Sequence, residues 1–355
     1  MRRRFQLLPT GITSFYLRTI SRKESLLLRN SFHRITRIIL LALVCKASVA
    51  QHALQMRGEI QGVHDPSIAE QSEHYYLFST GRAPDGGQLA IRCSDNLTNW
   101  KLCGHVFASL PPWIHAASPE TKDLWAPDIS FFHGRYHLYY VWSTFGSNNS
   151  GIALATNTTL DPASPDYRWQ DEGPVLQSRR GDDFNAIDPN ISADTSGRLW
   201  ISYGSLWSGI KLQQIDAVTG KLLPRGRTYS LASRPQPPHA VEAPFIVHHG
   251  SYYYLFVAFD LCCRGTKSTY RTVVGRSREI TGPYLDKTGK PMLQGGGSEL
   301  LTATRNWIGP GGASILQKPD QDLIVFHAYS AGTGTPTLQI STLQWEDDWP
   351  YAALQ

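Results

Sequence analysis

Metal-binding spacings and long apolar runs are both missing from this sequence. It has five cysteines in 355 residues and no C-x-x-C or H-E-x-x-H pattern. Those spacings are the usual signatures of zinc sites, so their absence argues against the common zinc-binding classes. A membrane-spanning helix needs about 20 apolar residues in a row. The apolar stretch near the N-terminus, residues 38–44, has only seven.

A basic surface is also missing from most of the chain. The formal net charge is +5, from 34 Lys and Arg against 29 Asp and Glu. Residues 1–50 contain ten of the basic residues and one acidic residue, which leaves a net charge of −4 for the remainder. Nucleic-acid-binding domains carry a clustered basic face. We therefore expect no nucleic-acid partner.

Residues 1–50 have the pattern of an export signal. Arg34 and Arg37 precede the apolar residues 38–44, and small residues at 47–50 offer a cleavage site before Gln51. We expect a secreted or periplasmic protein, cleaved near Ala50-Gln51, that is not held at a membrane afterwards. Residues 51–355 would then form a single domain and a monomer. A buried N-terminal helix is the alternative explanation of the apolar stretch.

Helical periodicity is absent from residue 63 onward, where short aromatic or apolar runs are broken by Gly, Asp, Asn and Pro. This pattern predicts strands and turns. The runs also repeat: a proline, an apolar strand, a polar turn and an aromatic strand recur in that order. The prolines stand at 66, 127, 189, 244 and 310, with spacings of 61, 62, 55 and 66 residues.

Five such units predict an all-β, five-bladed propeller with four antiparallel strands in each blade. The first strand of each unit, such as residues 245–247 in the fourth, would line a central channel. Residues 151–155 and 273–277 would be third strands of the second and fourth units. A pair of β-sandwiches is the alternative fold, but it does not explain a fivefold spacing.

Four of the five units place a carboxylate beside the proline: Asp65, Asp128, Asp188 and Glu242, with Gly309 in the fifth. In a propeller these positions gather at one mouth of the channel. Crowded carboxylates raise one another's pKa. A glycosidase needs that effect, because one carboxyl must stay protonated while another stays ionised. An Asp-Pro pair taken alone can also simply open a turn.

Four cysteines follow residue 50. Cys93 and Cys103 flank a predicted turn at 94–99, which favours a hairpin disulfide in an exported protein. Cys262 and Cys263 are neighbours, with Cα atoms about 3.8 Å apart. That is shorter than the usual disulfide span of about 4.4–6.8 Å. Geometry leaves two alternatives, a vicinal disulfide in a tight turn or two free thiols.

Taken in order, eight motifs between residues 63 and 311 resemble glycoside hydrolase family 43 and, within it, the endo-acting 1,5-α-L-arabinanases. Each motif is weak alone, but the ordered set is specific, and the similarity runs to about Trp349. The motifs are VHDPS (63–67), LWAPDI (124–129), STFGSN (143–148), NAIDPN (185–190), GSLWSGIK (204–211), EAPF (242–245), FDLCCRG (259–265) and IGPG (308–311).

The resemblance implies a five-bladed propeller that hydrolyses linear arabinan with inversion at the anomeric carbon, without a cofactor for the chemistry. It makes Asp65 the general base and Glu242 the general acid. Asp188 would tune the pKa of the acid and hold it in place. Asp128 matches a position near the substrate that is not one of the three catalytic residues.

The expected substrate contacts extend beyond the catalytic carboxylates. They are Asp65, Trp125, Asp128, Phe145, Gly146, Asn185, Ala186, Ile187, Asp188, Ser205, Leu206 and Trp207. The sequence departs from the family at two places. Leu206 stands where an aromatic residue is common, and Gly311-Gly312 replaces a Gly-His-like pair, which we expect to alter the channel floor.

His327 matches a histidine that lies, in related enzymes, beside a calcium or other ion held largely through waters. A histidine at a strand end is also commonly a satisfied structural group, so the residue itself leaves both readings open.

Other activities fit the same fold. An exo-acting α-L-arabinofuranosidase or β-xylosidase would need one end of the groove closed by a loop or an extra domain. A retaining fructan hydrolase also uses five blades and an Asp-Pro motif. An inactive sugar-binding propeller is a further alternative, which the presence of all three carboxylates in context argues against.

Overall fold

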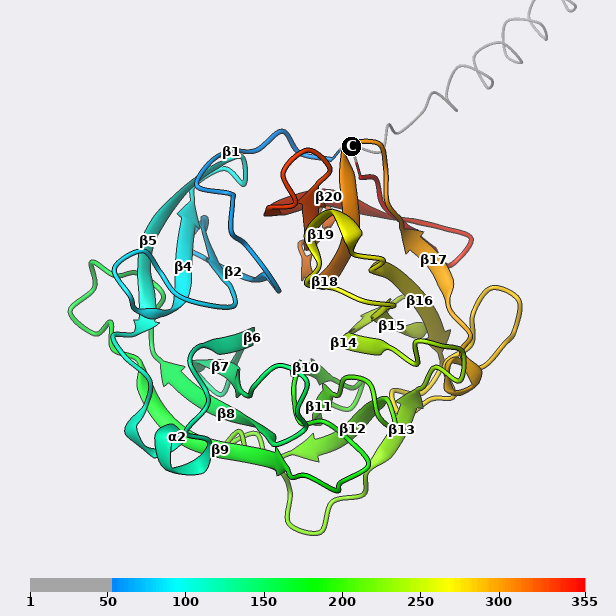
Figure 1. Cartoon of the computed structure of the whole chain (residues 1–355), viewed down its shortest axis with the longest axis horizontal. Coiled ribbons are helices and arrows are strands. Elements are labelled where there is room, and N and C mark those ends of the chain that lie inside the picture. The colour runs from blue at the N-terminus through cyan, green and yellow to red at the C-terminus, as the bar shows by residue number, and fades with distance from the viewer. Residues whose placement is uncertain (1–52, 355) are drawn as a thin grey trace, which may run out of the picture. The chain divides into compact units, whose positions relative to one another are not determined.

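The computed structural model describes residues 53–354, so the expected export signal at residues 1–50 lies outside the described part. Within residues 53–354, five sheets form a five-bladed propeller (Figure 1). The predicted all-β fold is therefore confirmed. Among these residues, none of the helices has the length and apolarity that a bilayer crossing requires.

Each blade consists mainly of four antiparallel strands in chain order. Blade 1 contains β2 (Ser67–Gln71), β3 (His74–Phe78), β4 (Gln88–Ser94) and β5 (Asn99–Phe107). Blade 2 contains β6 (Leu124–Phe132), β7 (Arg135–Trp142), β8 (Ser150–Asn157) and β9 (Gln170–Ser178). Blade 3 contains β10 (Asn190–Ala193), β11 (Leu199–Tyr203), β12 (Ile210–Ile215) and β13 (Tyr229–Ala232). Blade 4 contains β14 (Val241–His249), β15 (Tyr252–Phe259), β16 (Arg271–Ser277) and β17 (Ser298–Leu301). Blade 5 contains β18 (Trp307–Gln317), β19 (Asp322–Ser330), β20 (Pro336–Glu346) and β21 (Trp349–Tyr351).

The remaining elements are short. The strand β1 (Arg57–Gly58) pairs in parallel with β5. The helix α2 (Pro112–Ala117) joins blades 1 and 2, and the 3-10 turns η1 (Gly265–Lys267) and η2 (Met292–Gln294) lie in loops of blade 4. None of these short helices was predicted as an element, because six residues or fewer leave no readable helical period.

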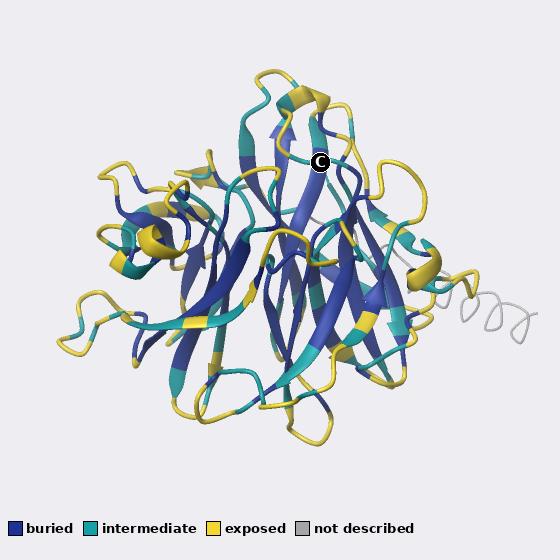
Figure 2. Ribbon diagram, turned by 60° about the horizontal axis from the view of Figure 1, so that its bottom comes forward, coloured by how far each residue is buried: buried dark blue, intermediate teal, exposed yellow. Residues whose placement is uncertain are grey.

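The aromatic second strands form the core of the blades. Strand β7 is buried along all but its first residue. Leu138 and Tyr140 pack in a cluster with blade 1, whereas Tyr139 and Val141 pack in a cluster with blade 3. Successive side chains of a strand point to opposite faces, so a strand between two neighbouring blades is apolar on both sides. Burial is accordingly concentrated in the strands and exposure in the loops (Figure 2).

The residue before each repeat proline has a left-handed backbone. The φ angles are 47° at Asp65, 39° at Ala126, 57° at Asp188, 52° at Ala243 and 59° at Gly309. The pairing of the inner strand shifts register at this place in blades 2, 4 and 5. This conformation is uncommon for residues other than glycine. Its fivefold recurrence shows that the repeat extends to the backbone of the channel mouth.

Segment 53–62 closes the ring. Leu54 N–H donates to the carbonyl of Ile340 at 2.8 Å, and Ile60 accepts from the N–H of Leu338 at 2.9 Å, both in β20 of blade 5. The same segment carries β1, which pairs with β5 of blade 1. It therefore covers part of the edge of β20 and joins the first blade to the last.

Both predicted cysteine pairs are bonded. Cys93 and Cys103 link β4 to β5 across the hairpin, which confirms that prediction. Cys262 and Cys263 form a vicinal disulfide, so the structure selects this alternative over free thiols. Their loop joins β15 to β16 at the same end of the propeller as Asp65.

Candidate active site

Three carboxylates from three blades lie close enough to act on one another. Asp65 directly precedes the repeat proline of blade 1, Asp188 occupies the same place in blade 3, and Glu242 is the second residue of β14. The charges of Asp65 and Glu242 raise the pKa of Asp188, and the charge of Asp65 also raises the pKa of Glu242. The sequence predicted four acids at the channel mouth, and the structure brings three of them, Asp65, Asp188 and Glu242, close enough to shift one another's pKa.

Asp65 is held as an anion. Its Oδ2 accepts a hydrogen bond from Thr80 Oγ1 at 2.7 Å and lies 2.8 Å from His64 Nδ1. Burial by itself would raise the pKa of Asp65, but the charge and hydrogen bond of His64, with help from Thr80, outweigh it. The net effect lowers the pKa well below that of an ordinary aspartate.

The surroundings of Glu242 shift its pKa in the opposite direction. Burial raises its pKa, while hydrogen bonds from Ser205 and Tyr270 partly oppose that effect. Ser205 Oγ lies 2.6 Å from Glu242 Oε2. Both partners are hydroxyl groups, which can accept a proton as well as donate one. The surroundings of Glu242 therefore tolerate a protonated carboxyl.

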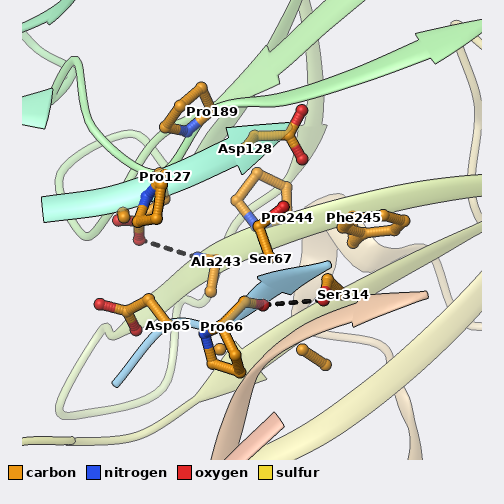
Figure 3. A pocket seen from close by; sticks show the side chains of 14 residues that line it. Asp65, Pro66, Ser67, Pro127, Asp128, Pro189, Ala243, Pro244, Phe245 and Ser314 are labelled. Carbon is orange, nitrogen blue, oxygen red and sulfur yellow. Dashed lines mark hydrogen bonds between the residues drawn. The ribbon is translucent and has the colours of Figure 1, made fainter. Parts of the chain in front are cut away.

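Asp188 accepts a hydrogen bond from the backbone N–H of Ala243 at 3.0 Å, drawn as a dashed line in Figure 3. Burial, followed by repulsion from Glu242 and Asp65, raises the pKa of Asp188. Asp188 and Glu242 thus form a pair that retains a proton to a higher pH than an isolated carboxylate. The N–H of Ala243 can only donate, so this hydrogen bond favours the ionised form of Asp188 and partly opposes the rise in its pKa.

Asp128 lines the same channel cavity but does not join this group of interacting carboxylates. Its side chain is buried, and its Oδ2 accepts from the backbone N–H of Ile191 at 3.0 Å in the next blade. Asn190 Nδ2 donates to Oδ1 at 3.2 Å. Figure 3 shows the carboxylate of Asp128 pointing away from that of Asp65. Burial raises the pKa of Asp128 to about 6, against these hydrogen bonds.

The position after each repeat proline explains the difference. Ser67 Oγ accepts from Ile129 N–H at 3.0 Å, just as Asp128 accepts from Ile191, and Asn190 Oδ1 accepts from Ile246 N–H at 2.8 Å. In blades 1 to 3 this position therefore ties one inner strand to the next. Asp65 and Asp188 precede their prolines and face the mouth, whereas Asp128 follows its proline and faces the neighbouring blade.

His327 lies beside Asp65 at the channel centre. Its Nδ1 accepts from Asp65 N–H at 3.2 Å, and its Nε2 is buried without a partner among the described residues. Burial, with the nearby charge of His64, lowers the pKa of His327 and keeps the ring neutral. Ligand atoms of His64, Asp65 and His327 all lie within 4.8 Å of one another, so this group could hold a metal ion.

Comparison with known families decides the class of the protein. The family described as Glycosyl hydrolases family 43 matches residues 60–350. The chain belongs to glycoside hydrolase family 43. The match extends from the segment before β2 to β21, so the resemblance drawn from the motifs is confirmed over the whole propeller.

Family 43 relatives of both modes of action resemble the chain. "Extracellular endo-alpha-(1->5)-L-arabinanase 1" of Bacillus subtilis (strain 168) is 42% identical over 290 residues, 81% of this chain and 87% of the relative. "Extracellular exo-alpha-(1->5)-L-arabinofuranosidase ArbA" of Cellvibrio japonicus (strain Ueda107) is 42% identical over 323 residues, 87% and 90% of the two. A solved Cellvibrio cellulosa α-L-arabinanase complexed with arabinohexaose has a TM-score of 0.78 at 41% identity, covering 83% of this chain and 96% of that one.

Two aromatic side chains stand out at the mouth of this family 43 site. Phe145 is 84% exposed and Trp207 is 45% exposed. They occupy equivalent loops, between the second and third strands of blades 2 and 3. Gly146 follows Phe145 with φ of 78°, and Leu206 precedes Trp207 with φ of 50°, so both loops turn sharply.

The other expected contacts differ in how much surface they offer. Trp125 and Ile187 are half-buried and pack against the cluster between blades 2 and 3. Ser205 is buried against Glu242. Ala186 is completely buried, and its N–H donates to Ser178 Oγ at 2.9 Å. Asn185 has a buried Oδ1 without a hydrogen-bond partner among the described residues, an acceptor suited to a hydroxyl group.

The channel below the carboxylates is narrow. A cavity of about 40 Å³ is lined by Asp65, Asp188, Gly312 and the repeat prolines of blades 1 to 4, among others (Figure 3). A cavity needs about 10–15 Å³ of such volume for one water molecule. The channel therefore has room for a few waters and not for a sugar.

Gly311 and Gly312 make this packing possible. A Cβ atom on Gly311 would lie 2.2 Å from the ring of Tyr270, and one on Gly312 would lie 2.7 Å from Asp65 Oδ1. Tyr270 and Asp65 therefore pack against bare backbone at these two positions.

Sequence reasoning gave no role to Thr80, Tyr270 or Tyr329. Thr80 binds Asp65, Tyr270 binds Glu242, and Tyr329 binds His64, whose Nε2 lies 2.8 Å from its hydroxyl. None of these residues lies in a motif that carried the resemblance. Their types are common in strands, so the sequence held no signal that could have singled them out.

Proposed function

We propose that this family 43 enzyme hydrolyses internal α-1,5-L-arabinofuranosidic bonds of linear arabinan with inversion at the anomeric carbon. The opposed ionisation of its carboxylates carries the proposal: surroundings lower the pKa of Asp65 and raise that of Glu242. Inverting glycosidases require one ionised and one protonated carboxyl on opposite sides of the scissile bond. The arabinanase relatives and the solved complex with arabinohexaose support arabinan as the substrate.

In this mechanism Glu242 donates its proton to the oxygen of the leaving sugar. Asp65 takes a proton from a water that attacks the anomeric carbon from the opposite face of the ring. Asp188 holds the anion of the coupled pair and bonds the backbone N–H of Ala243, next to Glu242. It thereby keeps Glu242 protonated and fixes the strand that carries it.

The acid and base assignments are tested by Asp65→Asn and Glu242→Gln. General acid or base catalysis contributes roughly 10²–10⁴-fold, so we expect losses in kcat of that size on linear arabino-oligosaccharides. Asp128→Asn is the matched control, because Asp128 is also a buried channel acid but faces the next blade. It should keep most of its activity. A near-normal kcat in Asp65→Asn or Glu242→Gln would contradict the role proposed for the residue that was changed.

The stereochemical course needs its own measurement. Proton NMR of the first product formed should show the anomer opposite to that of the substrate. A retained anomer, or turnover of sucrose, would replace this proposal with the retaining fructan hydrolase.

The products formed from debranched arabinan decide between endo and exo action. We propose endo action on the resemblance of the motifs and on the similarity to the B. subtilis endo-arabinanase. A ladder of oligosaccharides early in the reaction, with a rapid fall in viscosity, is expected. Accumulation of a single short product from one chain end would instead favour the exo mode of the Cellvibrio relative.

We also propose an ion near His327, held largely through waters. Two features fit an ion at this place: Nε2 of His327 has no partner among the described residues, and Nδ1 of His327 contacts Asp65. Hard cations such as calcium prefer six to eight oxygen ligands, more than these residues supply, so waters would complete the coordination. A bound cation would add positive charge beside Asp65. Calcium should raise the melting temperature of chelator-treated protein, and His327→Ala should abolish that rise. No shift in the parent protein would exclude calcium at this site.

The proposed location is outside the cytoplasm. The B. subtilis and C. japonicus relatives are both named as extracellular proteins, and the N-terminal pattern supports export through residues 1–50. Mass spectrometry of the secreted protein should find a new N-terminus near Gln51. An uncleaved N-terminus would overturn the export signal.

A further inference from the structure

We infer that the vicinal disulfide Cys262–Cys263 and Tyr329 form a positioning arm that orients His64 and, through it, Asp65. The inference rests on the proposed role of Asp65 as the general base. It assigns a function to the FDLCCRG motif, which the acid–base mechanism does not use. The arm acts on the catalytic carboxylate without contacting the reacting atoms.

A continuous chain of polar contacts carries the inference. Cys263 N–H donates to Tyr329 Oη at 2.9 Å, and Tyr329 Oη lies 2.8 Å from His64 Nε2. His64 Nδ1 then lies 2.8 Å from Asp65 Oδ2. Cys263 Sγ is itself 3.7 Å from His64 Nε2. These contacts therefore connect three blades, from the β15–β16 loop of blade 4 through β19 of blade 5 to the residues just before β2 of blade 1.

Two of the hydrogen-bond directions follow from chemistry. A backbone N–H can only donate, so Tyr329 Oη accepts from Cys263. An ionised carboxylate only accepts, so His64 presents an N–H on Nδ1 to Asp65. The contact between Tyr329 Oη and His64 Nε2 holds the other end of the ring, which keeps Nδ1 directed at Asp65.

The ring of His64 is also fixed in orientation. It stacks on His327 with centroids 3.7 Å apart, and Tyr329 packs edge-on against His327. A rotation of His64 about its long axis would break the contacts to Tyr329 and Asp65 together. The arrangement therefore transmits the position of the loop to the carboxylate.

The disulfide constrains the one residue that the arm begins with. Cys263 has φ of 64°, a left-handed conformation that a flexible loop would hold poorly, and the bond to Cys262 ties it to its neighbour. Asp260 anchors the base of the loop through Arg234 and Arg271, each at 2.8 Å. With the base held, the disulfide limits the remaining freedom at Cys263, so its N–H stays aimed at Tyr329.

The chain contains a matched control for disulfide chemistry. Cys93 and Cys103 form the other disulfide among the described residues, in the β4–β5 hairpin of blade 1. That pair packs against the cluster between blades 1 and 2, where it contacts none of the arm residues. Cys93→Ser with Cys103→Ser removes a disulfide of the same protein without altering the proposed arm.

The test measures kcat and KM on linear arabino-oligosaccharides for Tyr329→Phe, for Cys262→Ser with Cys263→Ser, and for the three changes together. Loss of one hydrogen bond corresponds to about 0.5–1.5 kcal/mol, or about 2- to 12-fold. We expect kcat to fall by that factor in each variant with KM unchanged. Because both changes interrupt the same series of polar contacts, kcat of the combined variant should be no lower than that of Tyr329→Phe alone.

Two His64 variants separate positioning from packing. Asn can place its amide nitrogen near the position of Nδ1, so His64→Asn keeps a donor to Asp65 but cannot reach Tyr329. It should retain more activity than His64→Ala and should become insensitive to removal of the Cys262–Cys263 bond. Misplacement of a catalytic group by about 1 Å can cost roughly 10²-fold, which is the loss expected for His64→Ala.

Three results would overturn the inference. Multiplicative losses in the combined variant would mean that the disulfide and Tyr329 act independently. A rise in KM at constant kcat for the Cys262/Cys263 variant would mean that the loop contacts the substrate instead of positioning Asp65. An equal loss of kcat in the Cys93/Cys103 control would mean that the effect comes from a loss of overall stability. Failure of the base assignment is distinct, because it would appear as normal activity in Asp65→Asn.

Discussion

Glu242 combines a functional requirement with a cost in stability. Burial raises the pKa of its carboxyl in the folded enzyme, whereas a glutamate in an unfolded chain titrates near about 4.3. Above that pH the unfolded state releases a proton that the native state retains. Stability therefore falls as pH rises through the window between the two pKa values, by about 1.4 kcal/mol for each unit that separates them.

Glu242→Gln should remove this dependence. We expect the inactive variant to melt at a higher temperature than the parent enzyme, with a gain that is larger at about pH 8 than at about pH 5. Thermal unfolding at the two pH values measures the effect, and Asp188→Asn should change stability in the same direction. A variant that melts lower than the parent at the higher pH would show that Glu242 contributes net stability as an anion.

The residue scale also shows why position relative to a proline matters more than residue type. Asp65 and Asp128 are both aspartates beside a repeat proline. The residue before the proline adopts positive φ and faces the mouth, whereas the residue after it bonds the next inner strand. Two residues of offset therefore separate a candidate catalytic group from a structural one.

At the scale of elements, equivalent loops carry different chemical groups in different blades. The loop after the second strand holds Phe145 in blade 2 and Trp207 in blade 3, and the vicinal disulfide in blade 4. The strands below provide a common frame, so the loops can vary while the fold is retained. This arrangement is consistent with a substrate that lies across the mouth on the aromatic loops of blades 2 and 3.

Trp207→Ala should raise KM on linear arabino-oligosaccharides with a smaller effect on kcat. Aromatic contacts of this kind contribute about 0.5–1.5 kcal/mol, which corresponds to a change of about 2- to 12-fold. Phe131 is the matched control, because it is 61% exposed but lies near the opposite end of β6 from Leu124. Phe131→Ala should leave KM unchanged. Equal effects of the two substitutions would place the substrate elsewhere.

At the scale of the whole molecule, the propeller is held by a closed ring of interactions. Each of five apolar clusters joins two neighbouring blades. The cluster between blades 5 and 1 includes Leu54, Met56 and Ile60 from the closing segment. The closing segment covers part of the edge of β20 and packs between blades 5 and 1. Loss of the segment would therefore expose that edge and the side of blade 1.

Deletion of residues 53–60 should therefore destabilise the entire fold. The segment supplies several backbone hydrogen bonds at about 1 kcal/mol each and three apolar side chains at up to about 1.5–3 kcal/mol each. That total is comparable with the usual stability of about 5–15 kcal/mol. Urea unfolding against a reference that begins at Gln51 measures the loss. An unchanged midpoint would show that the blades close without the segment.

The sequence by itself determined the repeat, and through it the fold. Strand alternation and turn residues are local properties, so five proline-marked units with an aromatic strand could be recognised without coordinates. The same is true of the Cys93–Cys103 hairpin, which joins adjacent strands. Asp65, Asp188 and Glu242 could be selected because their motifs are contiguous stretches of sequence.

Tertiary structure alone decided the partners and the charge states. Tyr329 meets His64 across 265 positions of sequence, and Asp128 meets Ile191 across 63, which no local pattern encodes. The directions of the pKa shifts also depend on burial and on which hydroxyl or N–H each carboxylate faces. Sequence could place the acids at a mouth, but only the packed blades show that the pKa of Asp65 is lowered, that of Glu242 is raised and the carboxylate of Asp128 bonds the neighbouring blade.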